Sequence, residues 1–346
     1  MKKLVIVGGG FAGAKIANKL QNRFKITLID TKDYFEFTPG ILRSMMNPNH
    51  LKKIDVCHSE YLKNSRIIND FMVGIKDKKV LLKRSKAVQF DYLIIASGSE
   101  YDSPIKAENI IIADRGQNIV KYHKKLENSK KIIIVGGGLV GVELAGEIVE
   151  KYKGKKSITI IHSGENLIVR NQIKSREYAE KFLMKKGVKI VFGERVKKNK
   201  SKERVVETDK KNNFPYDLVI MCTGIRPNSE FMNKNALDEK GFIKVNEFLQ
   251  MNGRKDIFIC GDIASIKEEK TAQGAEKQGA HVMENLKLLE GKKGLKPYHP
   301  RRRIMVISLG KWNGIFEWGS FVITGLIPAF MKWAIERKTM IRYRKL

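Results

Sequence analysis

KKLVIVGGGFAGAKIANKL, at residues 2–20, is echoed by KKIIIVGGGLVGVELAGEI at residues 130–148, so the chain carries an internal repeat. Each copy has a basic lead-in, a β-branched apolar run, a G-x-G-x-x-G motif and a helical pattern. A second apolar run follows each copy, KITLID at 25–30 and SITIIH at 157–162. A strand, a glycine turn, a helix and a second strand within about thirty residues are typical of a dinucleotide-binding unit. The repeat therefore predicts an α/β protein with two Rossmann-like units.

There is a physical reason for glycine at each of the three positions of the motif. The first permits the tight turn out of the strand, the second lets a pyrophosphate approach the backbone, and the third lets the helix pack close to the strand. The helix N-terminus then offers unpaired N–H groups and a partial positive charge to the phosphates. The predicted phosphate-binding residues are Gly8, Gly10, Ala12 and Gly13 in the first copy and Gly136, Gly138 and Gly141 in the second.

The two copies differ at the end of the second strand, where nucleotide identity is decided. The first copy ends in Asp30, a carboxylate placed to bind ribose hydroxyls. The aligned residue of the second copy is His162. Without a carboxylate there, a 2′-phosphate is not repelled, so NADPH is allowed beside NADH. His162 itself is more simply explained as a surface residue at a strand end than as a specific phosphate ligand.

The composition, 42% apolar and 30% charged, is that of a folded protein. No run approaches the roughly 20 uninterrupted apolar residues of a membrane-spanning helix, and the apolar start is too short for a signal peptide, so we expect an intracellular protein. The net charge of +30 indicates an anionic partner, such as a membrane surface, nucleic acid or phosphorylated cofactors, unless it only reflects a lysine-rich proteome. No nucleic-acid partner is expected, because nothing resembles a recognition helix or an RNA-binding signature.

The three cysteines, Cys57, Cys222 and Cys260, are far apart in the sequence. They form no C-x-x-C pair, so neither a zinc site nor a local redox disulfide is indicated. Cys222 and Cys260 lie in apolar strand-like segments and are expected to be buried structural thiols. Cys57 has no obvious partner.

Three further segments complete the pattern: FDYLIIASGSEYDSP at 90–104, YDLVIMCTGIRPN at 216–228 and DIFICGDIA at 256–264. Together with the repeat, they resemble the flavoproteins with two dinucleotide-binding domains over essentially residues 1–290. The resemblance implies an FAD domain made of residues 1–113 and 226–298, with an NAD(P)H domain, 114–225, inserted in it. It also implies further cofactor contacts at Ala96, Gly98, Gly224, Gly261 and Asp262. Asp262 could also cap a helix, since SIKEE follows it.

The segment GGGLVGVELAGE, residues 136–147, resembles the signature of type II NADH dehydrogenases. That resemblance places Glu143 near the nicotinamide and the flavin, as the catalytic candidate. The alternative is an ordinary acid in the first turn of a helix, favoured by the helix dipole.

TAQGAEKQG, residues 271–279, resembles the alanine–glutamine motif beside the quinone pocket of the same enzymes. Ala272, Gln273 and Gly279 match the motif, and Ala272 and Gln273 are the predicted quinone-binding residues. The second glutamine would fall at Lys277, with Gln278 one place later, so this sequence departs from the motif there. A helix start after a turn would also explain the segment.

From Gly291 to Leu346 the tail has thirteen Lys or Arg residues against two acids. Its apolar stretch 318–335 is interrupted by Pro328 and Lys332 and is too short to span a bilayer comfortably. Aromatic residues and flanking cations suit the boundary between water and anionic headgroups. We expect segment 299–346 to attach the protein to the cytoplasmic face of a membrane, or else to form a dimer interface or a core helix. The aromatic residues are Trp312, Phe316, Trp318, Phe321, Phe330 and Trp333.

The resemblance to type II NADH dehydrogenases, and to the related ferroptosis-suppressor quinone reductases, implies a reaction as well as a fold. A hydride would pass from NADH or NADPH to FAD, and two electrons would then pass to a quinone or another membrane-soluble acceptor. No proton pumping and no metal site are expected, and a homodimer is compatible with the sequence. Three alternatives stay open: a soluble flavin reductase serving a ferredoxin-like carrier, a sulfide:quinone oxidoreductase, and a flavin-bound sensor without enzymatic activity.

Overall fold

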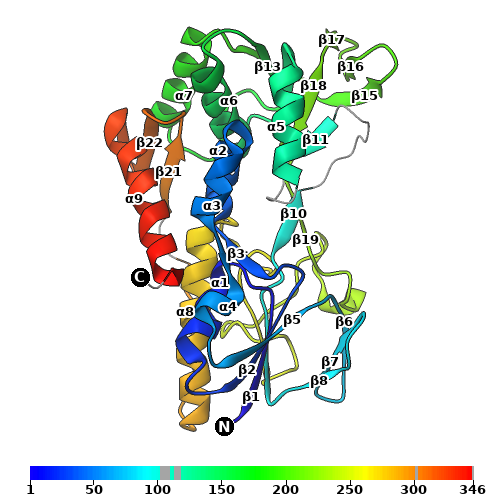
Figure 1. Cartoon of the computed structure of the whole chain (residues 1–346), viewed down its shortest axis with the longest axis vertical. Coiled ribbons are helices and arrows are strands. Elements are labelled where there is room, and N and C mark those ends of the chain that lie inside the picture. Colours follow the sequence, from blue (N-terminus) through cyan, green and yellow to red (C-terminus); the bar gives the residue numbers. More distant parts are fainter. Residues whose placement is uncertain (102–109, 113–117, 301–302, 345–346) are drawn as a thin grey trace.

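The first of two parallel sheets is assembled from distant parts of the chain (Figure 1). The computed structural model describes residues 1–101, 110–112, 118–300 and 303–344. In this part, the sheet has the strand order β20-β9-β1-β2-β5, and we call it and its helices the first unit. Its strands are β1 (Lys3–Val7), β2 (Lys25–Asp30), β5 (Ser65–Asn69), β9 (Tyr92–Ile95) and β20 (Ile257–Ile259). Helix α1 (Phe11–Leu20) connects β1 to β2 and packs beside α8 (Ala272–Glu290).

The second parallel sheet repeats this arrangement with a more continuous segment of chain. Among the described residues its order is β11-β18-β12-β13-β14, and with its helices it forms the second unit. The strands are β11 (Ile110–Ile112), β12 (Lys131–Val135), β13 (Ser157–His162), β14 (Lys189–Phe192) and β18 (Leu218–Met221). The helices are α5 (Ile119–Asn128), α6 (Leu139–Tyr152) and α7 (Ile173–Lys185).

The predicted α/β class is confirmed, and the two repeats adopt the same register. Strand β1 pairs with β2 from Lys3↔Lys25 onward, and β12 pairs with β13 from Lys131↔Ser157 onward. The β-branched runs of these strands are almost wholly buried, as expected for parallel strands covered on both faces. Each sheet places its glycine turn at the carboxyl end of a central strand, the usual position for nucleotide binding.

Two chain crossings join the units, and they lie side by side. Strand β10 (Ser99–Tyr101) leaves the first unit and pairs antiparallel with β19 (Ile225–Pro227), which returns to it. The predicted segments 90–104 and 216–228 therefore meet at the junction. Residues 102–104 of the first segment, and the predicted domain boundary between residues 113 and 114, lie outside the described residues. Strand β11 falls within the predicted FAD domain 1–113 but pairs with β18 in the second sheet, so the predicted boundary lies too late in the sequence.

Smaller elements cover the edges of the units. The antiparallel strands are β3 (Tyr34–Glu36) with β4 (Asp55–Cys57), β6 (Met72–Lys76) with β7 (Lys79–Leu82) and β8 (Val88–Gln89), and β15 (Val196–Lys200) with β16 (Val205–Thr208) and β17 (Asn213–Pro215). The short helices are α2 (Ile41–Met46), α3 (Leu51–Ile54) and α4 (His58–Tyr61), with single turns at Thr38–Gly40, Pro48–His50 and Lys234–Ala236.

The tail folds into a separate layer along one side of both units (Figure 1). It consists of the antiparallel strands β21 (Ile304–Ser308), β22 (Gly314–Trp318) and β23 (Phe321–Thr324), followed by α9 (Leu326–Tyr343). Strand β21 contacts α6, β22 and β23 contact α7, and α9 contacts α3 of the first unit. The predicted apolar stretch 318–335 is therefore not one segment, because it is divided between a hairpin and a helix.

The two ends of α9 have opposite environments. At its C-terminal end, the side chains of Met340 and Tyr343 are buried, with Tyr343 at 0% exposure. At its N-terminal end, Leu326, Ile327 and Phe330 are more than half exposed. The alternative of a core helix thus describes one end of α9 but not the other. In the part of the chain that the structure describes, no helix has the length and apolar character needed to cross a membrane.

The contact between the tail and the second unit depends on Gly146 of α6. A Cβ atom at Gly146 would lie 2.8 Å from the Cα of Leu309, in the turn between β21 and β22. We expect Gly146→Ala to lower the free energy of unfolding by about 1–2 kcal/mol, because crowding outweighs the better helix propensity of alanine. Denaturant unfolding measures the effect. Gly294→Ala is the matched control, since nothing lies within 4 Å of its Cβ position; equal stability of both variants would contradict the contact.

Candidate functional site

The glycine turn of the first unit forms a cradle of backbone atoms. Gly8 has a φ of +99°, and a Cβ there would lie 2.2 Å from the carbonyl oxygen of Ala96. A Cβ on Gly13 would lie 1.9 Å from the carbonyl oxygen of Gly8, whereas a Cβ on Gly10 would meet nothing within 4 Å. No side chain caps α1, which begins after Gly10. The turn is therefore packed from behind and open in front, which fits a pyrophosphate against the helix N-terminus.

The turn of the second unit has the same geometry. Gly136 has a φ of +111°, and a Cβ there would lie 2.4 Å from the carbonyl oxygen of Cys222. A Cβ on Gly141 would lie 2.0 Å from the carbonyl oxygen of Gly136, whereas a Cβ on Gly138 would meet nothing within 4 Å. Helix α6 also starts without a side-chain cap. Ala96 directly follows β9 and Cys222 directly follows β18, so they support the two turns from equivalent positions. Gly98 and Gly224 lie two residues further along the chain.

Asp30 lies at the end of β2, directly behind the first turn. Its Oδ2 atom accepts hydrogen bonds from the N–H of Gly9, at 2.7 Å, and from Nε2 of His58, at 3.3 Å. Its Oδ1 atom accepts a bond from the N–H of Lys32, at 3.2 Å, and a weaker one from the hydroxyl of Thr31, at 3.5 Å. Burial acts to raise the pKa of Asp30, but its interactions with His58 and Lys32 outweigh burial, so the net shift is downward. The carboxylate is held ionised as an acceptor.

His162 takes a different position behind the second turn. A Cβ on Gly137 would lie 2.9 Å from Cγ of His162, so the ring packs directly against the turn. Burial lowers the pKa of His162. A neutral, partly buried ring is neither a carboxylate that repels a 2′-phosphate nor a cation that attracts one.

The strand end at Gly261 and Asp262 is fixed by α8. The side-chain oxygen of Gln278 accepts the N–H of Gly261 at 2.7 Å, and its amide group donates to Glu268 at 2.6 Å. Ser99 donates to Asp262 at 3.0 Å. The helix-cap interpretation of Asp262 is wrong, because no helix directly follows it and the next one, α8, is capped by Thr271.

The predicted quinone motif is divided by the structure. Gln273 and Lys277 line a cavity of about 200 Å³, together with Arg303 and Ile304 of the tail, whereas Ala272 is not among the lining residues. Gln278 is buried at 2% exposure. Gly279 packs against α1, with its Cβ position 3.2 Å from the Cα of Ala12. Gln278 and Gly279 therefore serve the first unit and not the cavity.

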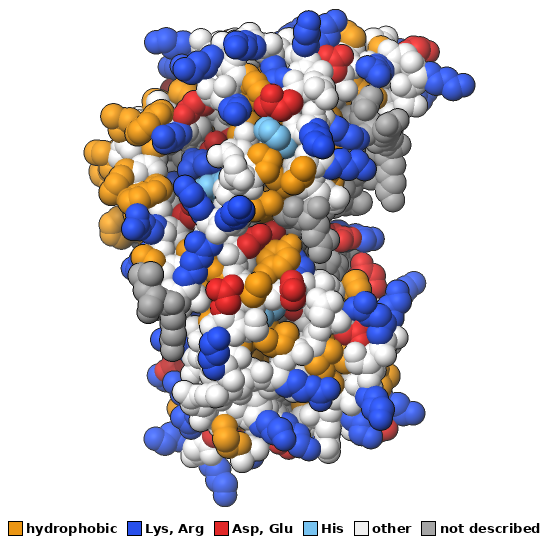
Figure 2. Space-filling model, viewed as in Figure 1, with side chains coloured by type: hydrophobic (Ala, Val, Ile, Leu, Met, Phe, Trp, Pro, Cys, Tyr) orange, Lys and Arg blue, Asp and Glu red, His pale blue; other side chains and the backbone are white. Residues whose placement is uncertain are grey.

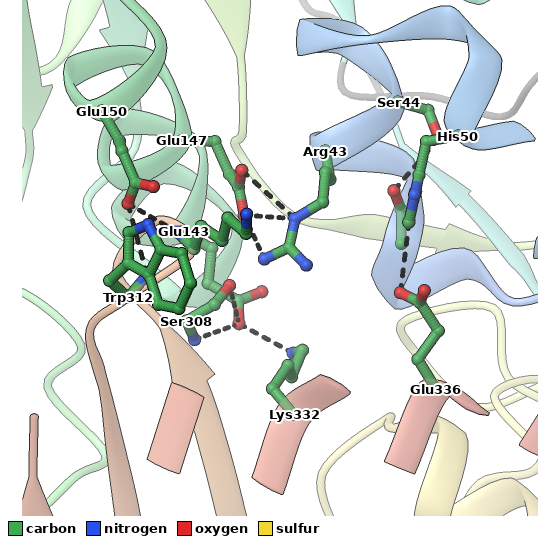
Figure 3. A network of polar contacts seen from close by, with 12 residues as sticks. Arg43, Ser44, His50, Glu143, Glu147, Glu150, Ser308, Trp312, Lys332 and Glu336 are labelled. Atoms are coloured by element: carbon green, nitrogen blue, oxygen red, sulfur yellow. Dashed lines mark hydrogen bonds and ion pairs between the residues drawn. The ribbon is translucent and has the colours of Figure 1, made fainter. Parts of the chain in front are cut away.

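Glu143 lies at the centre of a network that joins the tail to α6 (Figure 3). Its Oε1 atom accepts hydrogen bonds from the N–H of Ser308, at 2.8 Å, and from Nζ of Lys332, at 2.8 Å. The Glu143 residue is only 9% exposed. Glu143 is thus a buried ion-pair partner, which the alternative of an ordinary acid at a helix end does not explain.

The same network reaches the first unit. Arg43 of α2 donates to Oε1 of Glu147 through Nη2, at 2.9 Å, and through Nε, at 3.3 Å. Burial raises the pKa of Glu147, and the charge of Arg43 opposes it. His50 lies 3.2 Å from Glu336 of α9. Residues from the first unit, the second unit and the tail therefore meet in one place (Figure 3).

Sequence reasoning missed most of this network. Arg43, His50 and Ser308 lie outside any motif, and their partners are remote in the sequence. Among the missed members of the network, Lys332 was the one that the sequence could have indicated, because it interrupts an otherwise apolar stretch. A lysine in such a stretch requires a buried acid, and Glu143 is that acid.

The described cysteines and potential metal ligands form no second reactive centre. Burial raises the pKa of the Cys222 and Cys260 thiols to about 12, so these are structural thiols at neutral pH. Cys57 is exposed and unpaired. Among the described residues, no cluster of three or more His, Cys, Asp or Glu side chains is arranged to hold a metal ion.

Known proteins with similar sequences are consistent with two nucleotide-binding turns. A family model described as pyridine nucleotide-disulphide oxidoreductase matches residues 2–279. Ferroptosis suppressor protein 1 of Mus musculus is 32% identical over 343 residues, covering 95% of this chain and 92% of that protein. Apoptosis-inducing factor homolog A of Dictyostelium discoideum is 31% identical, with 93% and 87% coverage.

Solved structures of low sequence identity show the same fold over nearly all of the chain. The sulfide:quinone oxidoreductase of Aquifex aeolicus superposes with a TM-score of 0.88 at 21% identity, covering 99% of this chain and 92% of that one. NDH2 of Plasmodium falciparum in complex with NADH gives a TM-score of 0.84 at 16% identity, with 99% and 98% coverage.

Two glycine cradles of equal geometry suit the two cofactors of such proteins, FAD and either NADH or NADPH. The chain belongs to the pyridine nucleotide-disulphide oxidoreductase family, as an FAD-dependent oxidoreductase of pyridine nucleotides.

Proposed function

We propose that this oxidoreductase carries electrons from NADH or NADPH through FAD to a quinone, as a peripheral protein at the cytoplasmic face of a membrane. The observation that carries the proposal is that α9 has a paired lysine on one side and exposed aromatic side chains on another. Lys332 of this helix binds the buried carboxylate of Glu143 at 2.8 Å, while its neighbours Phe330 and Trp333 are 65% and 44% exposed. One helix thus connects the polar centre of the protein to an apolar outer surface.

The two cradles are assigned by the residues behind them. The first unit would bind FAD, with Asp30 accepting ribose hydroxyls and with Ala96, Gly98, Gly261 and Asp262 at the strand ends; it corresponds to the predicted domain 1–113 with 226–298, except for β11, which pairs in the second sheet. The second unit, which corresponds to the predicted domain 114–225 together with β11, would bind the nicotinamide nucleotide, with Gly224 beside it. When bound, FAD supplies the acceptance of a hydride and the release of two electrons. In this proposal the chain positions both nucleotides, and the reaction is not coupled to proton pumping.

Glu143 is the proposed catalytic residue. Its carboxylate is fixed from two sides, by the backbone of Ser308 and by the ammonium group of Lys332. Fixed charges in a site that excludes water act strongly on neighbouring groups and need no reorganisation during the reaction. We infer that Glu143 and Lys332 present this charge pair to the place where nicotinamide and flavin meet.

The outer surface of the tail is proposed to rest on the membrane, and we call it the aromatic face. Figure 2 shows hydrophobic side chains gathered along the edge of the molecule occupied by α9 and β22 in Figure 1. The nitrogen of Lys311 lies over the ring of Trp312, and Arg337 lies over the ring of Trp333, which supplies cations for headgroups. The aromatic face consists of Trp312, Trp318, Phe321, Leu326, Ile327, Phe330 and Trp333, each at least 44% exposed.

The cavity beside this face is the proposed quinone site. Ile304 lines the cavity and also pairs with Trp318 across the β21–β22 ladder, so the aromatic face extends to the cavity wall. The side-chain amide of Gln273 could bind a quinone carbonyl there, with Ala272 as its small neighbour. A membrane-dissolved acceptor would then reach the protein without crossing water.

Reduction by a nicotinamide nucleotide followed by quinone-dependent oxidation is the first expected outcome. Stopped-flow absorbance should show flavin bleaching by NADH or NADPH and rapid recovery on addition of a short-chain quinone. Bleaching without recovery would contradict the quinone proposal and favour a protein carrier, for which the net charge of +30 would attract an acidic partner. No bleaching by either nucleotide would favour a sensor.

Glu143→Gln should lower kcat with NADH and quinone by at least about tenfold, because it removes the charge and leaves the Lys332 ammonium unpaired in a buried site. Steady-state kinetics on samples of equal flavin content measure the change. Glu177→Gln is the matched control, since Glu177 lies exposed on α7 in a surface pair with Lys181. An unchanged kcat in Glu143→Gln would exclude the catalytic assignment.

Phe330→Glu combined with Trp333→Glu should abolish flotation of the protein with vesicles of anionic phospholipid, because it places charge within the aromatic face. These exposed substitutions are preferable to deleting residues 299–346, which would uncover the core beneath Tyr343. Val73→Glu, on the β6–β7 hairpin of the first unit, is the control for an exposed apolar residue. Equal flotation of the double variant and the control would refute the membrane proposal.

A further inference from the structure

The buried end of α9 contacts the first unit through aromatic rings. The ring centroid of Tyr343 lies 4.3 Å from that of Phe35 and 4.9 Å from that of Tyr61. Tyr343 is 0% exposed and Tyr61 is 2% exposed. Because the Tyr61 ring is enclosed, its hydroxyl group has a fixed direction, and that direction is set partly by the tail.

The Tyr61 hydroxyl binds a second buried group, His58. The oxygen of Tyr61 lies 2.6 Å from Nδ1 of His58, and Nε2 of His58 lies 3.3 Å from Oδ2 of Asp30. An ionised carboxylate only accepts hydrogen bonds, so Nε2 must carry a proton. In the neutral ring Nδ1 is then the acceptor, and Tyr61 donates to it. The hydroxyl of Tyr61 thereby selects the form of His58 that can donate to Asp30.

The chain of contacts ends at the first glycine turn. Oδ2 of Asp30 also accepts the N–H of Gly9, so this oxygen is held by two donors. A Cβ on Gly9 would lie 2.4 Å from both Oδ2 of Asp30 and Nε2 of His58. The missing side chain of Gly9 therefore makes room for the pair. The Oδ1 atom accepts from the N–H of Lys32, at 3.2 Å, and more distantly from the hydroxyl of Thr31, at 3.5 Å, and it is the oxygen that we assign to the ribose.

We propose that Tyr343, Tyr61 and His58 position Asp30 for FAD, so that docking of the tail helix on the first unit strengthens FAD binding. The proposal rests on the proposed assignment of Asp30 to the ribose of FAD. The three residues are positioning residues, because they act on the cofactor through Asp30. The tail would thus strengthen cofactor binding in the first unit as well as contact the membrane.

FMN provides the discriminating probe, because it is FAD without the adenylate half and has no adenosine ribose for Asp30 to bind. Apoprotein is titrated with FAD and with FMN, and flavin fluorescence gives both dissociation constants. Asp30→Ala should weaken FAD binding and leave FMN binding unchanged. His58→Ala should show the same selectivity, with a loss of about tenfold, the size expected for one hydrogen bond to a charged group.

Three further variants distinguish positioning from packing. His58→Gln keeps a side-chain N–H donor and should recover most of the FAD affinity lost in His58→Ala. Tyr343→Leu keeps an apolar side chain of moderate size and should weaken FAD binding severalfold, without changing FMN binding. Lys338→Ala, an exposed substitution on the same helix, is the control and should bind both flavins as the unmodified protein does.

The outcomes separate this inference from the assignment on which it rests. If Asp30→Ala leaves FAD affinity unchanged, the ribose assignment fails, and the inference fails with it. If Asp30→Ala selectively weakens FAD but His58→Ala and Tyr343→Leu do not, only the inference is overturned. Equal losses of FAD and FMN in His58→Ala would show that His58 stabilises the fold and does not position Asp30.

Discussion

The close approach of backbone to backbone at the two glycine turns is the constraint on which the rest of the structure depends. At Gly13 and Gly141 a Cβ atom would lie within 2.0 Å of a carbonyl oxygen, so no side chain is tolerated. That contact brings each helix N-terminus over the end of its strand and leaves it uncapped. The ion pair of Arg43 with Glu147 connects the first unit to α6 of the second unit, and the ion pair of Lys332 with Glu143 connects the tail to the same helix.

The repeat predicted the fold class because its signal is local. Every residue needed for one strand, turn and helix lies within a single stretch of sequence, and the register of β1 with β2 and of β12 with β13 follows from it. Asp30 was predictable for the same reason. The tail was not, because the contact of β21 with α6 and the burial of Tyr343 depend on partners that are remote in the sequence.

Only the site residues that belong to sequence motifs could be predicted. Glu143 lies within a sequence motif of the family, but its partner Lys332 lies in a mainly apolar stretch outside the motifs. His58 and Tyr61 belong to a short helix with no motif, and only the fold brings them behind Asp30. The alanine–glutamine motif misled in part, since Gln278 and Gly279 serve the packing of α8 against the first unit and not a pocket.

Strand β20 also affects the order in which the protein can fold during synthesis. The first sheet has its other described strands by Ile95, but β20 begins only at Ile257, after the whole second sheet has been made. The second unit can therefore complete its core on the ribosome, whereas the first must wait with one edge of β9 unpaired. The layer that covers both follows β20 in the sequence, so the nascent chain exposes apolar surface until residues 303–344 have emerged.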